Sequence, residues 1–125
     1  MKIFSVEEAN ALLPTVRRLA GRIQHTYKAL SSYQGVAKQA AEAAERGGGG
    51  IAEGVRYASI LTELTRLLNE LESLGVQIKD FGRGLVDFPS LRDGRVVLLC
   101  WQLGEGDTLE WWHDVDAGFA GRNPL

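Results

Sequence analysis

The sequence has few of the residues that form disulfide bonds and no long apolar run of the kind that anchors a protein in a membrane. Its 125 residues include one cysteine, Cys100, so no disulfide can form within one chain, which excludes the disulfide-rich secreted class. The longest apolar run, at 95–103, is far shorter than the roughly 20 residues that span a bilayer. The start, MKIFSVEEANALLP, lacks the basic and then apolar pattern of a signal peptide. We therefore expect a cytoplasmic protein that is not a membrane partner.

Negative charge is missing from residues 9–41. Between Glu8 and Glu42 there is no acid, whereas five residues there are basic. The formal net charge of −2 gives no global footprint for nucleic acid, which is an unlikely partner on this ground. Arg18, Arg22 and His25 nevertheless share one helix edge, so an anion-binding helical arm is one hypothesis, and a solvated face is the alternative.

A heptad pattern predicts a first long helix over 5–46. Ser5 and Glu8 form a capping box, and Pro14 predicts a kink or a restart. A seam of apolar residues with one polar member, Thr26, then recurs at alternating spacings of 3 and 4, namely Val16, Leu19, Ile23, Thr26, Leu30, Tyr33, Ala37, Ala40 and Ala44. The glycine-rich stretch 47–51 predicts a turn.

A second helix is predicted over 52–74, antiparallel to the first. Its seam is Tyr57, Leu61, Leu64, Leu68 and Leu71, widened by Ile60, Leu67 and Leu74. This apolar face is broader than a two-helix contact needs. The C-terminal strands or a second subunit should therefore cover part of it.

After residue 75 the hydrophobic period changes from 3.5 to 2. Four strands are expected between 76 and 116, with the sequences VQIKD, GLVDF, RVVLLCWQL and TLEWWHDV. Turn residues at FGRG, PSLRDG and GEGD separate them, and an irregular tail follows at 117–125. The predicted fold is a single α+β domain over 1–125, a long antiparallel helical hairpin (coiled-coil-like) followed by a small antiparallel β-meander.

Four segments carry a resemblance to a known family. They are FSVEEANALLP, GLVDFP, LCW followed by GE, and WWHDVDAGFAGRNPL. Together they resemble the bacterial family called domain of unknown function 2203. The resemblance covers the whole chain and implies a small bacterial cytoplasmic protein whose distinctive positions lie near its C-terminus. It implies no activity, substrate or catalytic residue.

The candidate ligand or metal site is the dense group Glu110, Trp112, His113 and Asp116, with Asp87 and Arg122. Imidazole and carboxylates suit a divalent metal, and a histidine oriented by a carboxylate suits proton transfer. On a strand, Asp116 would face away from His113 unless the strand breaks near residue 117. The alternative is a half-buried histidine bonded to backbone, with acids at the sheet edge and Asp87 forming a turn.

Other polar and aromatic residues have structural interpretations that compete with chemical ones. Cys100 could be a nucleophile or a metal ligand, but it lies in the most apolar run, where a thiol behaves as a small hydrophobe. Trp101, Trp111 and Trp112 could stack a planar ligand, but they also suit a small core, and the last two should face opposite sides of one strand. The motif GRG at 82–84 indicates a turn rather than a phosphate loop.

Three functional hypotheses follow. The first is a non-enzymatic interaction module that forms a homodimer through the hairpin and presents an aromatic and acidic C-terminal surface to a protein or small molecule. The second is a small metal-binding protein or hydrolase-like enzyme that uses His113 with Asp116 and Asp87. The third is the anion-binding arm. No cofactor is expected, although a divalent metal is possible under the second hypothesis.

Overall fold

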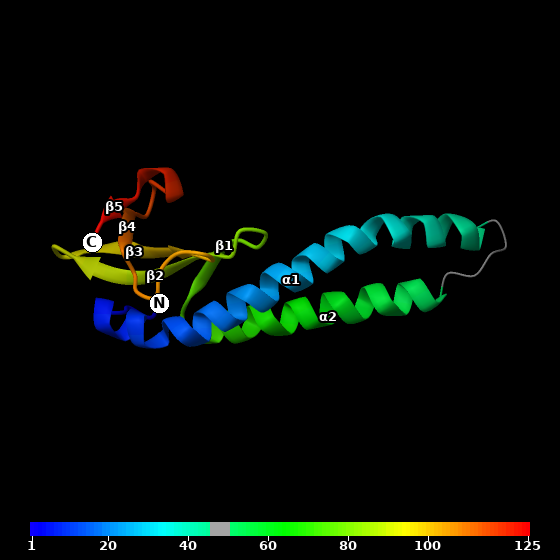
Figure 1. Ribbon diagram of the computed structural model, residues 1–125, viewed down its shortest axis with the longest axis horizontal. Helices are drawn as coiled ribbons and strands as arrows, with labels where there is room; N and C mark the ends of the chain where they lie inside the picture. Colours follow the sequence, from blue (N-terminus) through cyan, green and yellow to red (C-terminus); the bar gives the residue numbers. More distant parts are fainter. Residues whose placement is uncertain (46–50) are drawn as a thin grey trace.

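The computed structural model describes residues 1–45 and 51–125, apart from the side chains of 36, 37, 40, 43–45, 51 and 53. Its elements are α1 (Val6–Glu45), α2 (Ile51–Ser73), β1 (Gln77–Asp80), β2 (Leu85–Arg92), β3 (Arg95–Gln102), β4 (Trp111–Asp114), the 3-10 turn η1 (Phe119–Gly121) and β5 (Asn123–Pro124). The fold is α+β as predicted, and the two helices form a hairpin that projects well beyond the sheet (Figure 1). The glycines predicted to form its turn, 47–50, lie outside the described residues.

The capping box at the start of α1 is confirmed. The backbone N–H of Ser5 donates to Glu8 Oε1 at 2.9 Å, and the N–H of Glu8 donates to Ser5 Oγ at 3.0 Å. The restart expected at Pro14 is wrong, because α1 is one helix of 40 residues that includes this proline. Leu13 and Val16, on either side of it, are fully buried. Their packing holds the helix together where proline removes one backbone hydrogen bond.

The predicted seam of α1 is confirmed where its side chains are described. Buried members are Val16, Leu19, Ile23 and Leu30, whereas the side chains of Ala37, Ala40 and Ala44 lie outside the described residues. On α2, Leu61 was assigned to the seam wrongly, since its side chain is 44% exposed, whereas Leu67 is fully buried. The sheet packs against one side of α2 and shifts its buried stripe towards Leu67. No helix in the described residues has the length and apolar character needed to cross a bilayer.

The five strands form an antiparallel sheet in the order β1-β2-β3-β4-β5. The predicted meander is therefore confirmed for its first four strands. The tail is not wholly irregular as expected, because it contains η1 and the two-residue strand β5, which pairs with β4. The C-terminus is thus tied to the sheet.

The hairpin between β2 and β3 is tighter than predicted. The segment PSLRDG was expected to form a turn, but β2 continues to Arg92, and only Asp93 and Gly94 turn the chain, with φ angles of 52° and 78°. Two consecutive positive φ angles characterise the two-residue type I′ turn that suits twisted hairpins. Pro89 is tolerated within β2 because β1 pairs only as far as Asp87. Beyond that point, the N–H of Phe4 donates to the Pro89 carbonyl at 2.7 Å.

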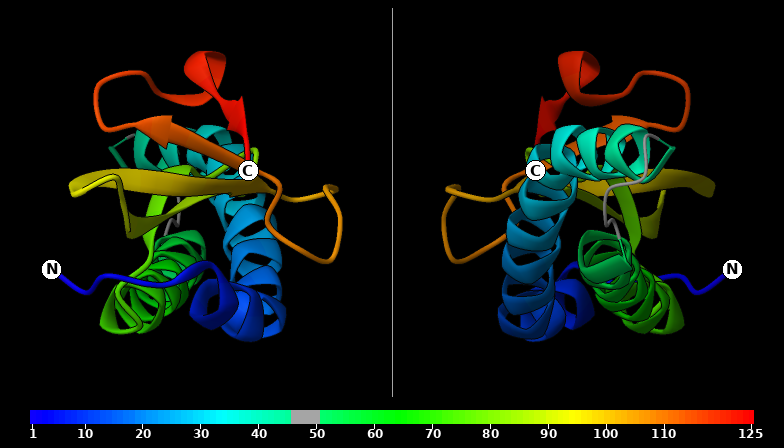
Figure 2. Two further views of the ribbon diagram at one scale, coloured as in Figure 1. Left: turned by 90° about the vertical axis from the view of Figure 1, so that its left-hand side faces the viewer. Right: turned by 90° about the vertical axis from the view of Figure 1, so that its right-hand side faces the viewer.

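The molecule has three layers, visible end-on in Figure 2: the helices, the sheet, and the C-terminal segment on the opposite side of the sheet. The core lies between the helices and the sheet. It includes the helix-facing residues Val86, Phe88, Leu99 and Trp101. Because side chains alternate along a strand, the residues between them point to the other face, beneath the C-terminal segment.

Candidate functional site

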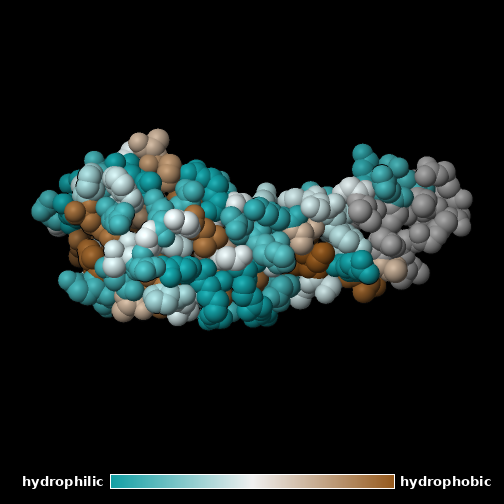
Figure 3. Space-filling model, viewed as in Figure 1, coloured by the Kyte–Doolittle hydropathy of each residue, from teal (hydrophilic) through white to brown (hydrophobic). Residues whose placement is uncertain are grey.

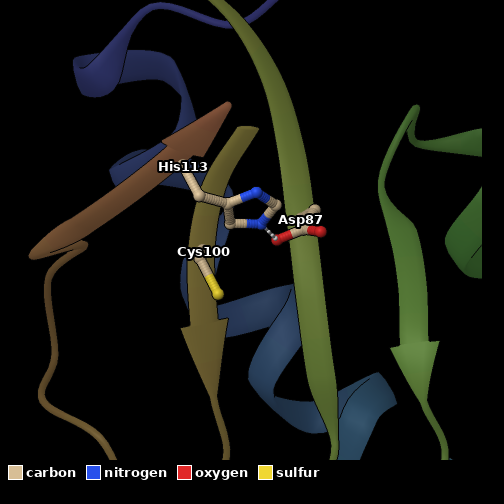
Figure 4. Close-up of side chains that lie close together, drawn as sticks. All are labelled: Asp87, Cys100 and His113. Carbon is tan, nitrogen blue, oxygen red and sulfur yellow. Dashed lines mark hydrogen bonds and ion pairs between the residues drawn. The ribbon is translucent and has the colours of Figure 1, made fainter. Parts of the chain in front are cut away.

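Three ionisable side chains lie together on the sheet face that points away from the helices. Asp87 of β2 is directly opposite Cys100 of β3, and His113 of β4 is opposite Leu98. Their possible ligand atoms all lie within 4.8 Å of one another (Figure 4). The exposed fractions are 2% for Asp87, 1% for Cys100 and 2% for His113. We call these three residues the buried cluster.

The hydrogen bonds of His113 define its orientation. Its Nδ1 lies 2.8 Å from the carbonyl oxygen of Asp114, which can only accept, so Nδ1 carries a hydrogen. Its Nε2 lies 3.1 Å from Asp87 Oδ1. An imidazole lone pair and a carboxylate oxygen attract each other only when a proton or another cation lies between them. A proton or another cation must therefore lie between Nε2 and Oδ1.

The thiol of Cys100 is protonated at neutral pH. Burial and, after it, the carboxylate of Asp87 raise its pKa, the guanidinium of Arg122 opposes them, and the net result is a pKa of about 12. Since the thiolate is the nucleophilic form of cysteine, the side chain is unreactive in this state. The predicted burial of Cys100 is confirmed, but the apolar surroundings assumed for it are wrong on the side of Asp87 and His113.

Arg122 closes the cluster from the C-terminal segment. Its Nη1 lies 4.0 Å from Cys100 Sγ and 2.8 and 3.1 Å from the two carboxylate oxygens of Glu105. Its guanidinium carbon is 4.9 Å from the ring centre of Trp111 and 4.0 Å from that of Phe119. Stacking and ion pairing of this kind fix a guanidinium firmly. The tail therefore places a fixed positive charge beside the sulfur.

The structure brings together only part of the predicted site. His113 and Asp87 pair, and Arg122 contacts the neighbouring Cys100, but Asp116 and Glu110 are exposed and do not belong to the buried cluster. The break in β4 that Asp116 would need comes after Asp114, yet it does not turn Asp116 towards His113.

Trp112 faces the helices, as the alternation of a strand requires. Its ring packs against the hydrophobic core, and the guanidinium of Arg92 lies 4.6 Å from its centre. Its buried Nε1 has no hydrogen-bond partner among the described residues. Trp111 lies on the opposite face beneath Arg122, so the two tryptophans separate as predicted. Trp112 is therefore part of the core rather than of the cluster.

Sequence reasoning missed Glu105, and it favoured a small buried hydrophobe over a ligand at Cys100. The alternation in VDF and LCW contains a usable signal, because Asp87 and Cys100 both lie between residues that face the helices. What the alternation omits is the register that sets Asp87 opposite Cys100.

A second feature lies on the face of α2 opposite its core. Val55, Ala58, Thr62, Thr65 and Asn69 recur at spacings of 3, 4, 3 and 4, and all five are exposed. We call these residues the outer seam. They include no charged side chain, and Figure 3 shows hydrophobic residues reaching the surface along the helical hairpin. A hollow beside the outer seam is lined by Leu61, Thr62, Thr65, Arg66 and Asn69.

The basic edge of α1 is partly neutralised within the chain. Arg22 Nη2 lies 3.0 Å from Glu63 Oε1 of α2, whereas Arg18 and His25 are exposed. This pairing removes one of the three groups on which the anion-binding hypothesis depends.

The chain was compared with protein families, curated proteins and solved structures. No curated protein and no solved structure matches it. The model of one family, described as an uncharacterized conserved protein (DUF2203), matches residues 2–125. This match agrees with the resemblance carried by the opening segment and the C-terminal segments. The chain therefore belongs to the DUF2203 family of uncharacterized conserved proteins.

Proposed function

We propose that this protein is a non-enzymatic interaction protein that pairs with a second copy of itself through the outer seam of α2. One observation carries the proposal: five exposed, uncharged residues in heptad spacing lie on the side of α2 opposite its buried stripe. A helix that packs on a single side needs one apolar stripe. A second stripe of uncharged residues in heptad spacing is typical of a helix with two packing partners.

The spacing of the outer seam favours an identical, antiparallel partner. If two α2 helices cross at Thr62, Val55 of each copy meets Asn69 of the other, and Ala58 meets Thr65. Such an isologous contact closes on itself and leaves no free copy of the surface. The small side chains at its centre allow the helices to approach closely. Two hairpins joined in this way form a four-helix bundle.

The polar atoms of the outer seam can be buried at low cost. The hydroxyls of Thr62 and Thr65 each donate to a backbone carbonyl one turn earlier, at 2.9 Å, so a partner can cover them without breaking a hydrogen bond. Val55 is 64% exposed, and burying a side chain of this kind contributes about 1 kcal/mol or more. Arg66, beside the seam, is already paired with Glu63 and Glu70.

The sheet end of each copy would then be the surface offered to other partners. Antiparallel pairing places the two sheets at opposite ends of the bundle, and α1 alone is about 60 Å long at 1.5 Å per residue. On the sheet, the cross-strand pair Leu91 and Val96 is 59% and 36% exposed, and Val115 nearby in the register is 57% exposed. A non-enzymatic role also agrees with the protonated, enclosed thiol of Cys100.

Sedimentation equilibrium on the full chain tests the proposal. The wild type should be a dimer at tens of micromolar, and Thr65→Glu should be a monomer, because it places a charge in the outer seam. The matched control is Ser32→Glu, an equally drastic change at an exposed position of α1 outside the outer seam. This control should remain dimeric with unchanged helix content by circular dichroism. A monomeric wild type, or a dimeric Thr65→Glu variant, would reject the outer seam as the contact.

A further inference from the structure

The buried cluster is costly unless something compensates for it. A carboxyl, a thiol and an imidazole are almost completely excluded from solvent on one sheet face. Burying a carboxylate or a charged imidazole is unfavourable unless the group is paired or binds a cation. In the structure Nε2 of His113 pairs with Oδ1 of Asp87, the thiol of Cys100 also faces the Asp87 carboxylate, and Arg122 Nη1 lies 4.0 Å from its Sγ.

We propose that the buried cluster is a binding site for one divalent cation of the zinc class, with Asp87 Oδ1, Cys100 Sγ and His113 Nε2 as its ligands. The donor set defines this class. A thiolate with an imidazole selects zinc and similar transition metals and disfavours magnesium and calcium, which prefer oxygen alone. Three protein ligands leave one tetrahedral position for water or a further group.

The geometry needs little change to accept the ion. Metal–ligand bonds of about 2.0–2.3 Å at tetrahedral angles place the ligand atoms about 3.4–3.6 Å from one another. In the structure Nε2 and Oδ1 are 3.1 Å apart, and all three atoms lie within 4.8 Å. Each ligand comes from a different strand of one sheet, so the backbone fixes all three Cα positions (Figure 4). Side-chain rotations that move each ligand atom by less than about 1 Å suffice.

The outer contacts of the cluster are those that a metal site requires. His113 donates from Nδ1 to the carbonyl of Asp114, which leaves Nε2 as the coordinating atom and fixes the plane of the ring. Arg122 places its charge beside the sulfur and is itself balanced by Glu105. A neighbouring guanidinium stabilises the thiolate that a metal requires.

Binding of the cation leaves the net charge of the buried cluster unchanged. On binding, Cys100 loses its thiol proton, and the proton between His113 and Asp87 also leaves, so two protons are exchanged for one dication. No net charge is added to a space that excludes solvent.

Cobalt(II) binding to the metal-free, tag-free full chain tests this proposal. Cobalt takes tetrahedral zinc sites, and a thiolate ligand gives it a sulfur-to-metal absorption band in the near ultraviolet. Because Cys100 is the one cysteine of the sequence, such a band can arise within one chain only from this site. We expect one cobalt per chain with this band, and its loss when zinc is added.

Two matched variants locate the ligands. Cys100→Ser should abolish the band and weaken zinc binding at least about 100-fold, which is the upper end of the effect of removing a supporting contact. Asp116→Asn removes a nearby exposed carboxylate that lies outside the cluster, so it should leave the band and the affinity unchanged. A folded wild type that gives no band, or a band that survives Cys100→Ser, overturns the proposal. The wild-type measurement decides it alone if that variant does not fold.

Discussion

At the scale of single residues, the environment of Cys100 determines the protonation state of its thiol. Three effects act on its thiol: burial and the Asp87 carboxylate disfavour the thiolate, and the Arg122 guanidinium favours it. Without a bound metal the first two prevail, and the pKa of the thiol rises from its ordinary value of 9.0 to about 12. The sequence therefore favours a small buried hydrophobe at this position, whereas the structure places its sulfur beside two other possible metal ligands.

This shift makes a prediction for stability against pH. Above pH 9 the unfolded chain loses the Cys100 proton while the folded chain keeps it until about pH 12, so the unfolded state is favoured as pH rises. For this one group, the free energy of unfolding should fall by about 1.4 kcal/mol per pH unit in that window. Urea unfolding of metal-free wild type and Cys100→Ala between pH 8 and 11 measures it. The wild type should lose stability faster with pH, and parallel curves would contradict the assignment.

At the scale of elements, two glycines with positive φ test how turns join the strands. Gly84 has φ of 61° and Gly94 has φ of 78°. A Cβ on Gly84 would collide with the side chain of Leu103, whereas a Cβ on Gly94 meets no heavy atom of the described residues within 4 Å. The two positions therefore share the backbone requirement and differ in packing.

Alanine at each position separates these two terms. Gly94→Ala should cost about 1 kcal/mol, the strain of a left-handed conformation for a residue with a Cβ. Gly84→Ala should cost about 1–3 kcal/mol more, because it also overpacks the turn against Leu103. Urea unfolding of both variants gives the comparison. Equal costs would show that Leu103 moves aside freely and would reject the close packing.

How far the elements could be predicted depends on whether their signal is local. The capping box at Ser5 and the period of α1 are local, so the sequence indicated them correctly. Pro89 misled, because a proline is tolerated at the strand edge that β1 leaves unpaired. Leu61 misled because a heptad count omits the sheet that packs on one side of α2. The buried cluster depends on register between three strands, which no single strand encodes.

At the scale of the whole molecule, an open five-stranded sheet packs against one end of a helical hairpin that extends past it. The sheet covers one end of the hairpin and leaves the other described part of the two helices uncovered (Figure 1). In the proposed dimer, the outer seam of α2 is the face on which a second copy would complete the bundle. Self-association through this seam is the central claim, and the antiparallel arrangement is its most specific consequence.

Site-directed disulfide trapping tests that claim most directly. A cysteine at Thr62 lies on the proposed two-fold axis, next to its own mate, so Thr62→Cys should form a covalent dimer under mild oxidation. In the antiparallel pair the two Val55 positions are about 21 Å apart along the helix at 1.5 Å per residue, beyond disulfide reach, so Val55→Cys should stay monomeric on non-reducing gels. Cys100 is buried in both variants and should not interfere. The proposed dimer would be contradicted if Val55→Cys cross-linked as rapidly as Thr62→Cys, or if neither variant cross-linked.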